Sequence, residues 1–399
     1  MSQRSIIIRA DANSSIGMGH MMRTLSIADA FKSAGNSVRF ILADDTAREL
    51  VNGRGYEAII LNSCFDHMDD ELNLWPSVTP DLIIVDSYYV TSAYLNRLKE
   101  MLGEMSRRLL GGLKSKNGGR GKLAYLDDVL SFPYPVDILV NYNAYASQEL
   151  YDTLYVGSEV DKPRMVLGAT YAPLRSMFCG VAKKIQPEVV RNILISTGGS
   201  DELHLSLSLI EKIVSGRNDD KASNKDGYKN SEKYVYHFLI GAMNADKEAI
   251  HRLASEVDNV VLHENVTNMR ELIDSCDLAI SAAGSTMYEI AACGVPLITY
   301  SLADNQIPGG QEFERLGMGV YIGDLRDPKS IDPKLVMSGV LDSGACERIL
   351  SAVDELADDY DKRVAMGKRM QEMIDGLGAD RMIEELLKGK RQIIDSIDL

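Results

Sequence analysis

A histidine near the N-terminus stands where it could act as a general base. His20 ends the segment SSIGMGH, which follows the apolar run SIIIRA and opens an amphipathic stretch over residues 19–35. At the first turn of a helix, the positive end of the helix dipole disfavours the imidazolium form. A neutral imidazole can take a proton from water near pH 7, and Gly17 and Gly19 leave space for a substrate beside the backbone. We interpret His20 as the catalytic base; capping or packing is the structural alternative, which we prefer for the other histidines.

Two further loops have the composition of anion-binding sites. GGSD (198–201) and AAGST (282–286) each place small residues between an apolar run and a helical stretch. Bare backbone N–H groups and the positive end of a helix can hold a phosphate there, and hydroxyl groups add donors. A tight turn with a serine N-cap is the alternative for either loop alone, but two such loops favour a diphosphate. The predicted binding residues are Gly199, Ser200, Asp201, Gly284, Ser285 and Thr286.

Glu289 follows the second of these loops. It lies five residues after Gly284, one helical turn into GSTMYEIAACGVP. From that position its carboxylate could bind the vicinal hydroxyl groups of a ribose while the loop holds the phosphates. Its neighbours Ile290, Ala291 and Ala292 predict a largely buried helix, where a carboxylate without a partner is costly. We therefore predict that Glu289 binds the ligand.

Polar side chains also end several apolar runs of the first half. These are Asp11, Asp86, Tyr88, Asp127 and Asp128. In open α/β sheets, ligands bind beyond the carboxyl ends of the strands, so these side chains are expected near one site. Such aspartates could hold magnesium, but no tight D-x-D pair occurs, and we predict no metal. IGMGH lacks the third glycine of a dinucleotide fingerprint, so no cofactor is expected either.

The elements that must position these residues follow a repeated pattern. Apolar runs alternate with amphipathic stretches through the first half, and the pattern restarts near residue 192. Fully apolar strands separated by helices predict parallel sheets covered on both faces. The expected α/β protein has a first domain over 1–165, a second over 185–330 and C-terminal helices over 331–399. Residues 103–122 and 215–233 are predicted insertions.

Charge and cysteine content restrict the partners and the compartment. The sequence has 58 acidic and 43 basic residues, and the net charge of −15 argues against nucleic acid as a partner. No apolar run reaches the roughly 18 residues of a membrane span, and the N-terminus lacks the pattern of a signal peptide. The five cysteines are far apart, without metal-ligand spacing. We expect a cytoplasmic monomer that binds a small molecule and neither nucleic acid nor a membrane.

Taken together, the motifs resemble one family. The chain is similar to the pseudaminic-acid pathway hydrolases in the segments IRADANSSIGMGHMMRTLSIA, VDSYYV, LDD, LISTGGSD and SAAGSTMYEIAACGVPLITYSLADNQ, in the same order over residues 5–325. Those enzymes cleave UDP-2,4-diacetamido-2,4,6-trideoxy-β-L-altropyranose to the free sugar and UDP. The second half resembles, more distantly, the N-acetylglucosaminyltransferase that forms lipid II. Departures are the two insertions, the longer C-terminal tail and Ser87, where such proteins often carry histidine.

The resemblance implies a GT-B fold, in which two Rossmann-like domains hold the ligand in the cleft between them and the last helix crosses back to the first domain. It implies His20 as the base with Tyr88 and Asp86 beside it, and we add Asp11 to this catalytic group. The glycine-rich loops and Glu289 would bind UDP without a metal. The motif G-x-G-H-x-x-R adds Gly17, Gly19 and Arg23 to the substrate-binding residues, and A-D-N-Q adds Asn305 and Gln306 near the phosphate and sugar.

The predicted reaction is hydrolysis of a UDP-sugar with inversion at the anomeric carbon. Glycosidases need a carboxylic acid to protonate a poor leaving group, but UDP already leaves readily, so one base and several N–H dipoles could suffice. One alternative is a GT-B glycosyltransferase, in which an acceptor hydroxyl group replaces water. Another is a hydrolysing nucleotide-sugar 2-epimerase, which requires a further acid/base pair at C2. A non-catalytic nucleotide-sugar sensor is the third.

Overall fold

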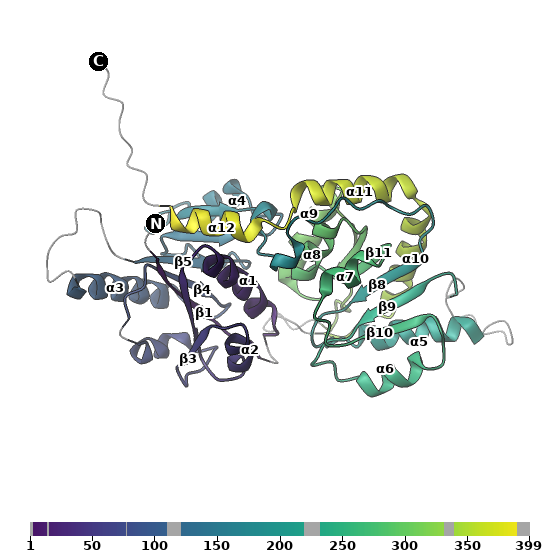
Figure 1. Ribbon diagram of the computed structural model, residues 1–399, viewed down its shortest axis with the longest axis horizontal. Coiled ribbons are helices and arrows are strands. Elements are labelled where there is room, and N and C mark those ends of the chain that lie inside the picture. Colours follow the sequence, from purple (N-terminus) through teal and green to yellow (C-terminus); the bar gives the residue numbers. More distant parts are fainter. Residues whose placement is uncertain are drawn as a thin grey trace, which may run out of the picture.

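The structure is a computed structural model that describes residues 3–13, 16–76, 78–109, 121–218, 232–330 and 339–388. These ranges form two α/β domains, each built on one parallel sheet (Figure 1). Both predicted insertions fall in part outside the described residues. None of the helices within these ranges combines the length and the apolar content that a bilayer crossing requires.

The first sheet has seven parallel strands in the order β3-β2-β1-β4-β5-β6-β7. In chain order these are β1 (Ser5–Ala10), β2 (Ser37–Leu42), β3 (Glu57–Ile60), β4 (Leu82–Asp86), β5 (Lys122–Leu126), β6 (Ile138–Asn141) and β7 (Arg164–Leu167). The helices of this domain are α1 (Gly19–Ser33), α2 (Arg48–Gly53), α3 (Ser92–Leu109) and α4 (Gln148–Leu154). Sequence reasoning missed β7, because its four residues RMVL lie in a segment without alternating runs and helices.

Strand β1 is central because both of its faces are apolar. Ile8 packs in the cluster that contains Phe31 of α1, whereas Ile7 packs on the opposite face with Leu95 of α3. All of these side chains are fully buried. Strand β1 pairs with β4 in parallel register, which sets Ala10 beside Asp86 at the carboxyl edge of the sheet. The same edge therefore carries the segment that leads into His20.

The second sheet repeats this strand order. Its six parallel strands lie in the order β10-β9-β8-β11-β12-β13. They are β8 (Asn192–Ser196), β9 (Val235–Leu239), β10 (Val260–His263), β11 (Leu278–Ala282), β12 (Leu297–Ser301) and β13 (Val320–Asp324). The helices that follow the first five of them are α5 (Leu205–Asn218), α6 (Lys247–Ala254), α7 (Met269–Asp274), α8 (Ser285–Cys293) and α9 (Ile307–Arg315). The chain continues with α10 (Ala345–Asp358), α11 (Tyr360–Met373) and α12 (Gly378–Leu387). Sequence reasoning did not separate β13 from the helix before it.

Both sheets have a topological switch point, where successive connections leave toward opposite sides. It lies between β1 and β4 in the first sheet and between β8 and β11 in the second. Ligands of doubly wound sheets bind in the crevice at this point. Most of the predicted site residues lie at the ends of these four strands or after them, while Asn305 and Gln306 follow β12. The strand order therefore brings the candidate base and the predicted anion-binding loops to two crevices.

The chain crosses between the domains twice, and the two crossings touch. The first follows β7 and contains the short helices η2 (Ala169–Tyr171) and η3 (Ser176–Phe178); the second joins α11 to α12. Cys179 Sγ lies 3.0 Å from the carbonyl oxygen of Gly376. A Cβ atom at Gly376 would come 2.0 Å from the Phe178 carbonyl oxygen, and the φ angle there is +80°, so this approach requires glycine.

After the second crossing, helix α12 lies on the first domain against α1 (Figure 1). Met382 and Leu386 of α12 are buried in the same apolar cluster as the inner face of α1. Three cations contact the carbonyl end of α12: Arg4 donates to the Leu387 oxygen at 2.7 Å, Arg164 to the Glu385 oxygen and Lys122 to the Lys388 oxygen. Cations at this end also complement the helix dipole. The predicted domain limits themselves stay a prediction.

A histidine pair on the second sheet predicts acid sensitivity. His237 of β9 and His263 of β10 approach within 2.9 Å (Nδ1 to Nε2), and His237 Nε2 lies 3.1 Å from Asn192 Oδ1. Because the amide oxygen accepts, His237 donates from Nε2, and its Nδ1 accepts from His263 Nε2–H. Protonation of Nδ1 would set two N–H groups against each other, and burial lowers the pKa of both rings.

The unfolded chain therefore binds more protons than the native protein below the ordinary histidine pKa of about 6.5. This contribution to stability is present above about pH 6.5 and is lost as the pH falls through the lowered pKa. The pair is half-exposed, so we expect a loss of less than about 1 kcal/mol. Urea unfolding at about pH 7.5 and about pH 5.5 should show a smaller decrease for His237→Gln than for the wild type. Equal decreases would contradict the prediction.

Candidate active site between the two domains

His20 and Asp86 form a buried hydrogen-bonded pair at the first switch point. His20 is the second residue of α1, and Asp86 is the last residue of β4. His20 Nδ1 lies 2.6 Å from Asp86 Oδ1. Burial alone would raise the pKa of Asp86, but the charges and hydrogen bonds of Arg23 and His20 outweigh it and lower that pKa to about 2. Because an ionised carboxylate only accepts, Nδ1 is the donor in this contact, and Nε2 is the nitrogen that carries the lone pair when the ring is neutral.

This tautomer is the one that a general base needs, since Nε2 can take a proton while Nδ1–H stays bound to the carboxylate. The sequence-based argument relied on the helix dipole alone. In the structure, the hydrogen bond to Asp86 orients the imidazole ring, which the dipole argument did not include. The resemblance had implied that Asp86 lies beside His20.

Arg23 lies one helical turn after His20 and fixes Asp86. Its Nε donates to Asp86 Oδ2 at 2.6 Å and its Nη2 to Oδ1 at 2.5 Å, while Nη1 donates to Asp128 Oδ2 at 2.9 Å. Such fork-shaped pairing holds a carboxylate in one orientation. Arg23 was predicted to bind substrate. It does line the cleft, but its donors are engaged within the protein: besides the two carboxylates, Nη1 reaches the Tyr142 hydroxyl group at 3.4 Å and Nη2 lies 3.1 Å from His20 Nδ1. Arg23 therefore supports the geometry of the histidine.

Tyr88 links the histidine to the second domain. Its ring packs edge-on against His20, with ring centroids 4.3 Å apart. Its hydroxyl group lies 3.3 Å from Asp128 Oδ2, to which it donates, and accepts from Asn305 Nδ2 at 3.2 Å. The structure thus places Tyr88 beside His20, as the resemblance implied, and brings Asn305 of the second domain to the same place. Gln306 Oε1 accepts from the Leu302 backbone at 2.9 Å and shapes the loop that carries Asn305.

Asp11 belongs to a different cluster. One of its oxygens accepts from the Ala43 backbone at 2.8 Å, and the other binds the fully buried Arg9. Arg9 in turn binds Glu71 with two hydrogen bonds of 2.8 Å. The contacts of Asp11 hold the edge of the sheet together and include none to His20. Its predicted place in the catalytic group therefore has no support from the geometry.

The loop GGSD follows β8, at the second switch point. Asp201 is buried and accepts from the backbone N–H groups of Leu205 at 3.1 Å and Ser206 at 2.9 Å. It caps the start of α5, so its carboxylate is used within the protein. The backbone of Gly199 lies against Gly241, where a Cβ atom would come 2.1 Å from the Gly199 oxygen. Gly199 and Ser200 are the residues of this loop that stay available for a ligand.

The loop AAGST follows β11 and opens α8. Gly284 precedes the helix and supplies no capping side chain, while Ser285 and Thr286 are its first two residues. The backbone N–H groups of a first helical turn have no partner within the helix. A phosphate placed there would be bound by these groups and by the positive end of the dipole. This is the arrangement that the sequence predicted for Gly284, Ser285 and Thr286.

Glu289 lies one turn into α8 and is paired with Arg175. Arg175 donates a hydrogen bond from Nε to Glu289 Oε1 at 3.0 Å, and its Nη2 lies 2.8 Å from the same oxygen in an ion pair. Burial raises the pKa of Glu289, and Arg175 opposes this rise. The two side chains line a pocket with an empty volume of about 370 Å³ between the domains. Its lining comes from α1, from the segment after β6, from the first crossing and from α8, and includes Met22, Arg23, Ser26, Tyr142, Pro173, Leu174, Ser285 and Tyr288.

Three of these cleft residues were missed by sequence reasoning: Arg175, Tyr142 and Tyr288. Tyr288 bridges the domains, since its hydroxyl group accepts from the Ala144 backbone at 3.1 Å and its ring lies 5.7 Å from that of Tyr142. A signal for Tyr288 existed, because it stands inside the motif GSTMYE. The segment around Arg175 carries no motif, so only the fold shows where this residue lies.

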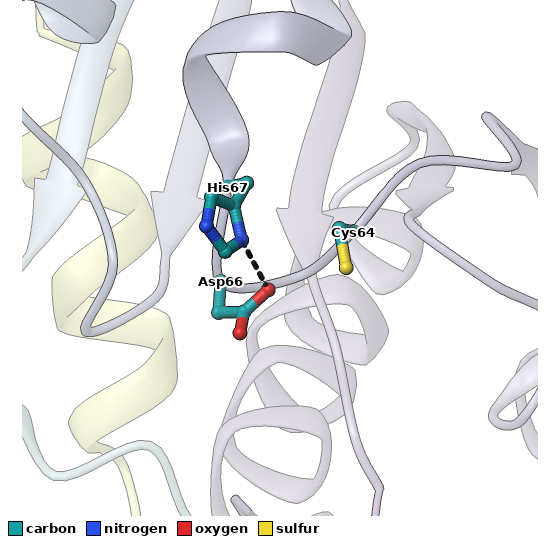
Figure 2. Close-up of side chains that lie close together, drawn as sticks. All are labelled: Cys64, Asp66 and His67. Atoms are coloured by element: carbon teal, nitrogen blue, oxygen red, sulfur yellow. Dashed lines mark hydrogen bonds and ion pairs between the residues drawn. The ribbon is translucent and has the colours of Figure 1, made fainter.

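A cluster on the surface loop after β3 also has ligand-type side chains, as Figure 2 shows. Cys64, Asp66 and His67 are all exposed, and their potential ligand atoms lie within 4.8 Å of one another. Asp66 and His67 satisfy each other through a hydrogen bond of 2.8 Å. The cluster lies outside the described cleft lining, and we assign it no part in the chemistry. The expectation that the reaction needs no metal stays a prediction.

Sequence comparison finds relatives with related descriptions. Residues 193–336 match the sequence model of the glycosyltransferase family 28 C-terminal domain. An uncharacterized protein of Methanocaldococcus jannaschii is 25% identical over 302 residues, and the chain covers about half of it, 54%. Spore coat polysaccharide biosynthesis protein SpsG of Bacillus subtilis is 23% identical, over 94% of this chain and 95% of that protein. The UDP-2,4-diacetamido-2,4,6-trideoxy-β-L-altropyranose hydrolase of Campylobacter jejuni is 24% identical, and the alignment covers 71% of this chain and 86% of that protein.

Comparison with solved structures confirms the predicted fold class. The calicheamicin glycosyltransferase CalG4 aligns over 97% of this chain and 99% of its own, with a TM-score of 0.55 and 17% identity. MnaA of S. aureus, solved with UDP, aligns over 96% of each chain with a TM-score of 0.56 and 11% identity. The protein therefore has a GT-B type fold: two parallel-sheet α/β domains followed by C-terminal helices.

Proposed function

We propose that this protein is a nucleotide-sugar hydrolase that cleaves the anomeric C–O bond of a UDP-activated diacetamido-trideoxy sugar. The observation that carries the proposal is the His20–Asp86 pair, which leaves Nε2 free at a switch point beside the interdomain pocket. Two loops at the other switch point, whose composition predicts phosphate binding, support it, as does the description of the Campylobacter jejuni relative. The proposed enzyme is a cytoplasmic monomer.

In the proposed reaction, His20 Nε2 takes a proton from water as the water oxygen attacks the anomeric carbon. The bond from that carbon to the UDP oxygen breaks with its electron pair on UDP, and the configuration inverts. Asp86 stabilises the imidazolium that forms, because Nδ1–H stays bound to its carboxylate. The proton then passes to solvent. No general acid is required, since backbone N–H groups stabilise the charge on the departing diphosphate.

The binding roles follow from position. Gly199, Ser200, Gly284, Ser285 and Thr286 would hold the diphosphate, and Glu289 would accept from the ribose hydroxyl groups. Asn305 and Gln306 would lie near the β-phosphate and sugar, where Asn305 already contacts Tyr88. Gly17 and Gly19 would leave room for the sugar before α1. Arg23 supports Asp86, and Asp11 supports the sheet edge, so we assign neither a direct contact with the substrate.

A GT-B glycosyltransferase is the second candidate, because residues 193–336 match a glycosyltransferase domain. His20 would then deprotonate an acceptor hydroxyl group instead of water. A 2-epimerase would need a further acid/base pair at C2 of the sugar.

One assay distinguishes these functions. The purified protein would be incubated with UDP-diacetamido-trideoxy-altrose and EDTA, without an acceptor, and UDP release and sugar configuration would be followed by NMR. We expect UDP release in the presence of EDTA, inverted configuration at C1 and retained configuration at C2. No release with tight UDP binding would favour the transferase, an inverted C2 would indicate the epimerase, and abolition by EDTA would contradict the metal-free mechanism.

A further inference from the structure

Arg175 is held in place by the crossing between the domains. It lies between η2 and η3, on the segment that the second crossing touches at Gly376. Its guanidinium carbon lies 5.5 Å from the centre of the Phe178 ring, which is fully buried. A cation–π contact and a packed backbone leave the side chain few alternative positions. Arg175 is therefore presented to the cleft from a fixed segment rather than from either sheet.

The contact with Glu289 is one-sided. The hydrogen bond from Arg175 Nε, at 3.0 Å, and the ion-pair contact of Nη2, at 2.8 Å, both end on Oε1. Among the described residues, no hydrogen bond to Oε2 is found. The pair is mostly buried, with 18% of the Arg175 and 16% of the Glu289 side chain exposed, so the charge of one partner acts on the other with little screening. Glu289 thus keeps one oxygen anchored and one available in the pocket.

We propose that Arg175 is a positioning residue for Glu289, which keeps the carboxylate ionised and directed into the cleft and so makes binding selective for ribose over 2′-deoxyribose. The inference rests on the proposed function, since it takes the ligand to be a uridine nucleotide. The two hydroxyl groups of a vicinal diol would donate to the carboxylate, which must be ionised because protonation of the available oxygen puts a donor in place of an acceptor. A hydrogen bond to a charged group also contributes more than one to a neutral group.

Other titratable groups facing this pocket do not change charge near neutral pH. Arg23 is paired with Asp86 and Asp128. Burial raises the pKa of Tyr142 and of Tyr288 above the ordinary range for tyrosine, so both stay protonated. Burial also raises the pKa of Glu289, and Arg175 is the group that opposes it. Loss of Arg175 should therefore make the ionisation of Glu289 visible in ligand binding.

The test is calorimetric titration of the full chain with UDP and 2′-deoxy-UDP between about pH 8 and about pH 6. As the pH falls from about 8 to about 6, the UDP affinity of Arg175→Met should decrease about tenfold more than that of the wild type. The wild type should prefer UDP by at least about tenfold, and the variant should lose that preference at the acid end. Arg175→Lys should restore the wild-type profile. Comparison at each pH cancels titration of the terminal phosphate, whose second pKa is about 6.

Two controls separate the charge from the fold. Glu289→Gln should bind UDP and 2′-deoxy-UDP equally well, both with Arg175 present and in combination with Arg175→Met. Arg381→Met removes a cation that also binds the first crossing, through the Thr170 carbonyl oxygen at 3.1 Å, and should behave as the wild type. An Arg175→Met profile identical to the wild type would overturn the proposal. An equal loss of affinity for UDP and for 2′-deoxy-UDP at every pH would also overturn it, since Arg175 would then bind the phosphates directly.

A ligand-free measurement distinguishes this failure from failure of the proposed function. If the wild type binds neither nucleotide, the function is wrong, but the effect on Glu289 can still be measured. A carboxylate with a raised pKa in the folded state loses stability as the pH rises through that pKa. The difference in Tm between Arg175→Met and the wild type should therefore grow from about pH 5 to about pH 8. A constant difference would overturn the inference whatever the ligand.

Discussion

Replacement of His20 by alanine is expected to lower kcat for UDP-sugar hydrolysis by about 100-fold to about 10,000-fold. The change removes the only group that the proposed mechanism uses to take a proton from water. Affinity for UDP should stay within about twofold of the wild type, since the proposed binding residues for the nucleotide lie in the other domain. Initial rates of UDP release and calorimetric titration with UDP measure the two effects separately.

Asp86→Asn should reduce the rate by at least about 100-fold with little loss of fold, because an amide facing Nδ1 favours the tautomer with the proton on Nε2. His251→Ala is the matched control: His251 is exposed on α6 and binds only Glu264 in the contacts described. It should keep full activity. An active His20→Ala variant would show that the base lies elsewhere, and a His20 variant that fails to bind UDP would indicate a binding role instead.

Glu71→Ala is expected to lower the free energy of unfolding by about 3–5 kcal/mol. Glu71 and Arg9 are both fully buried, and Glu71 also accepts from the Tyr94 hydroxyl group at 2.8 Å. Removal of the carboxylate leaves Arg9 in the core with only Asp11 as a charged partner. Urea unfolding monitored by circular dichroism gives the change, and the transition of the first domain should move.

The pair Arg9→Met with Glu71→Leu should recover much of this stability, because apolar residues of similar volume can replace a buried ion pair at little cost. Lys162→Ala is the control at an exposed pair with Asp152 and should change stability by less than about 1 kcal/mol. A loss for Glu71→Ala no larger than the control would mean that water reaches Arg9.

Much of the fold could be predicted from the sequence, because the apolar runs are long and regular. The run around Ile7 is buried on both faces, which is what a central parallel strand requires. The predicted two-domain GT-B class is confirmed, whereas the limits at 165, 185 and 330 stay predictions. Strand β7 escaped notice because a four-residue edge strand carries too little pattern to separate it from a loop.

The candidate site was predictable only where a residue follows a strand directly. His20, Asp86 and Gly284 were found in this way. Arg175 could not be found, since its position depends on two crossings that meet only in three dimensions. For Asp11 and Asp201 the geometry adds what sequence position lacks: both follow apolar runs, and their oxygens accept from Ala43 and from the start of α5. Sequence position indicates which edge a carboxylate occupies, not which partner it has.

The return of α12 to the first domain has a consequence for biosynthesis. The first sheet and α1 leave the ribosome early, but the surface that α12 covers with Met382 and Leu386 stays exposed until almost four hundred residues have been made. Throughout that interval the second domain can fold on its own strands, whereas the first displays an uncovered apolar groove. We therefore expect the first domain to be completed after the second, and we expect its apolar surface to be prone to aggregation until residues 378–387 have been made.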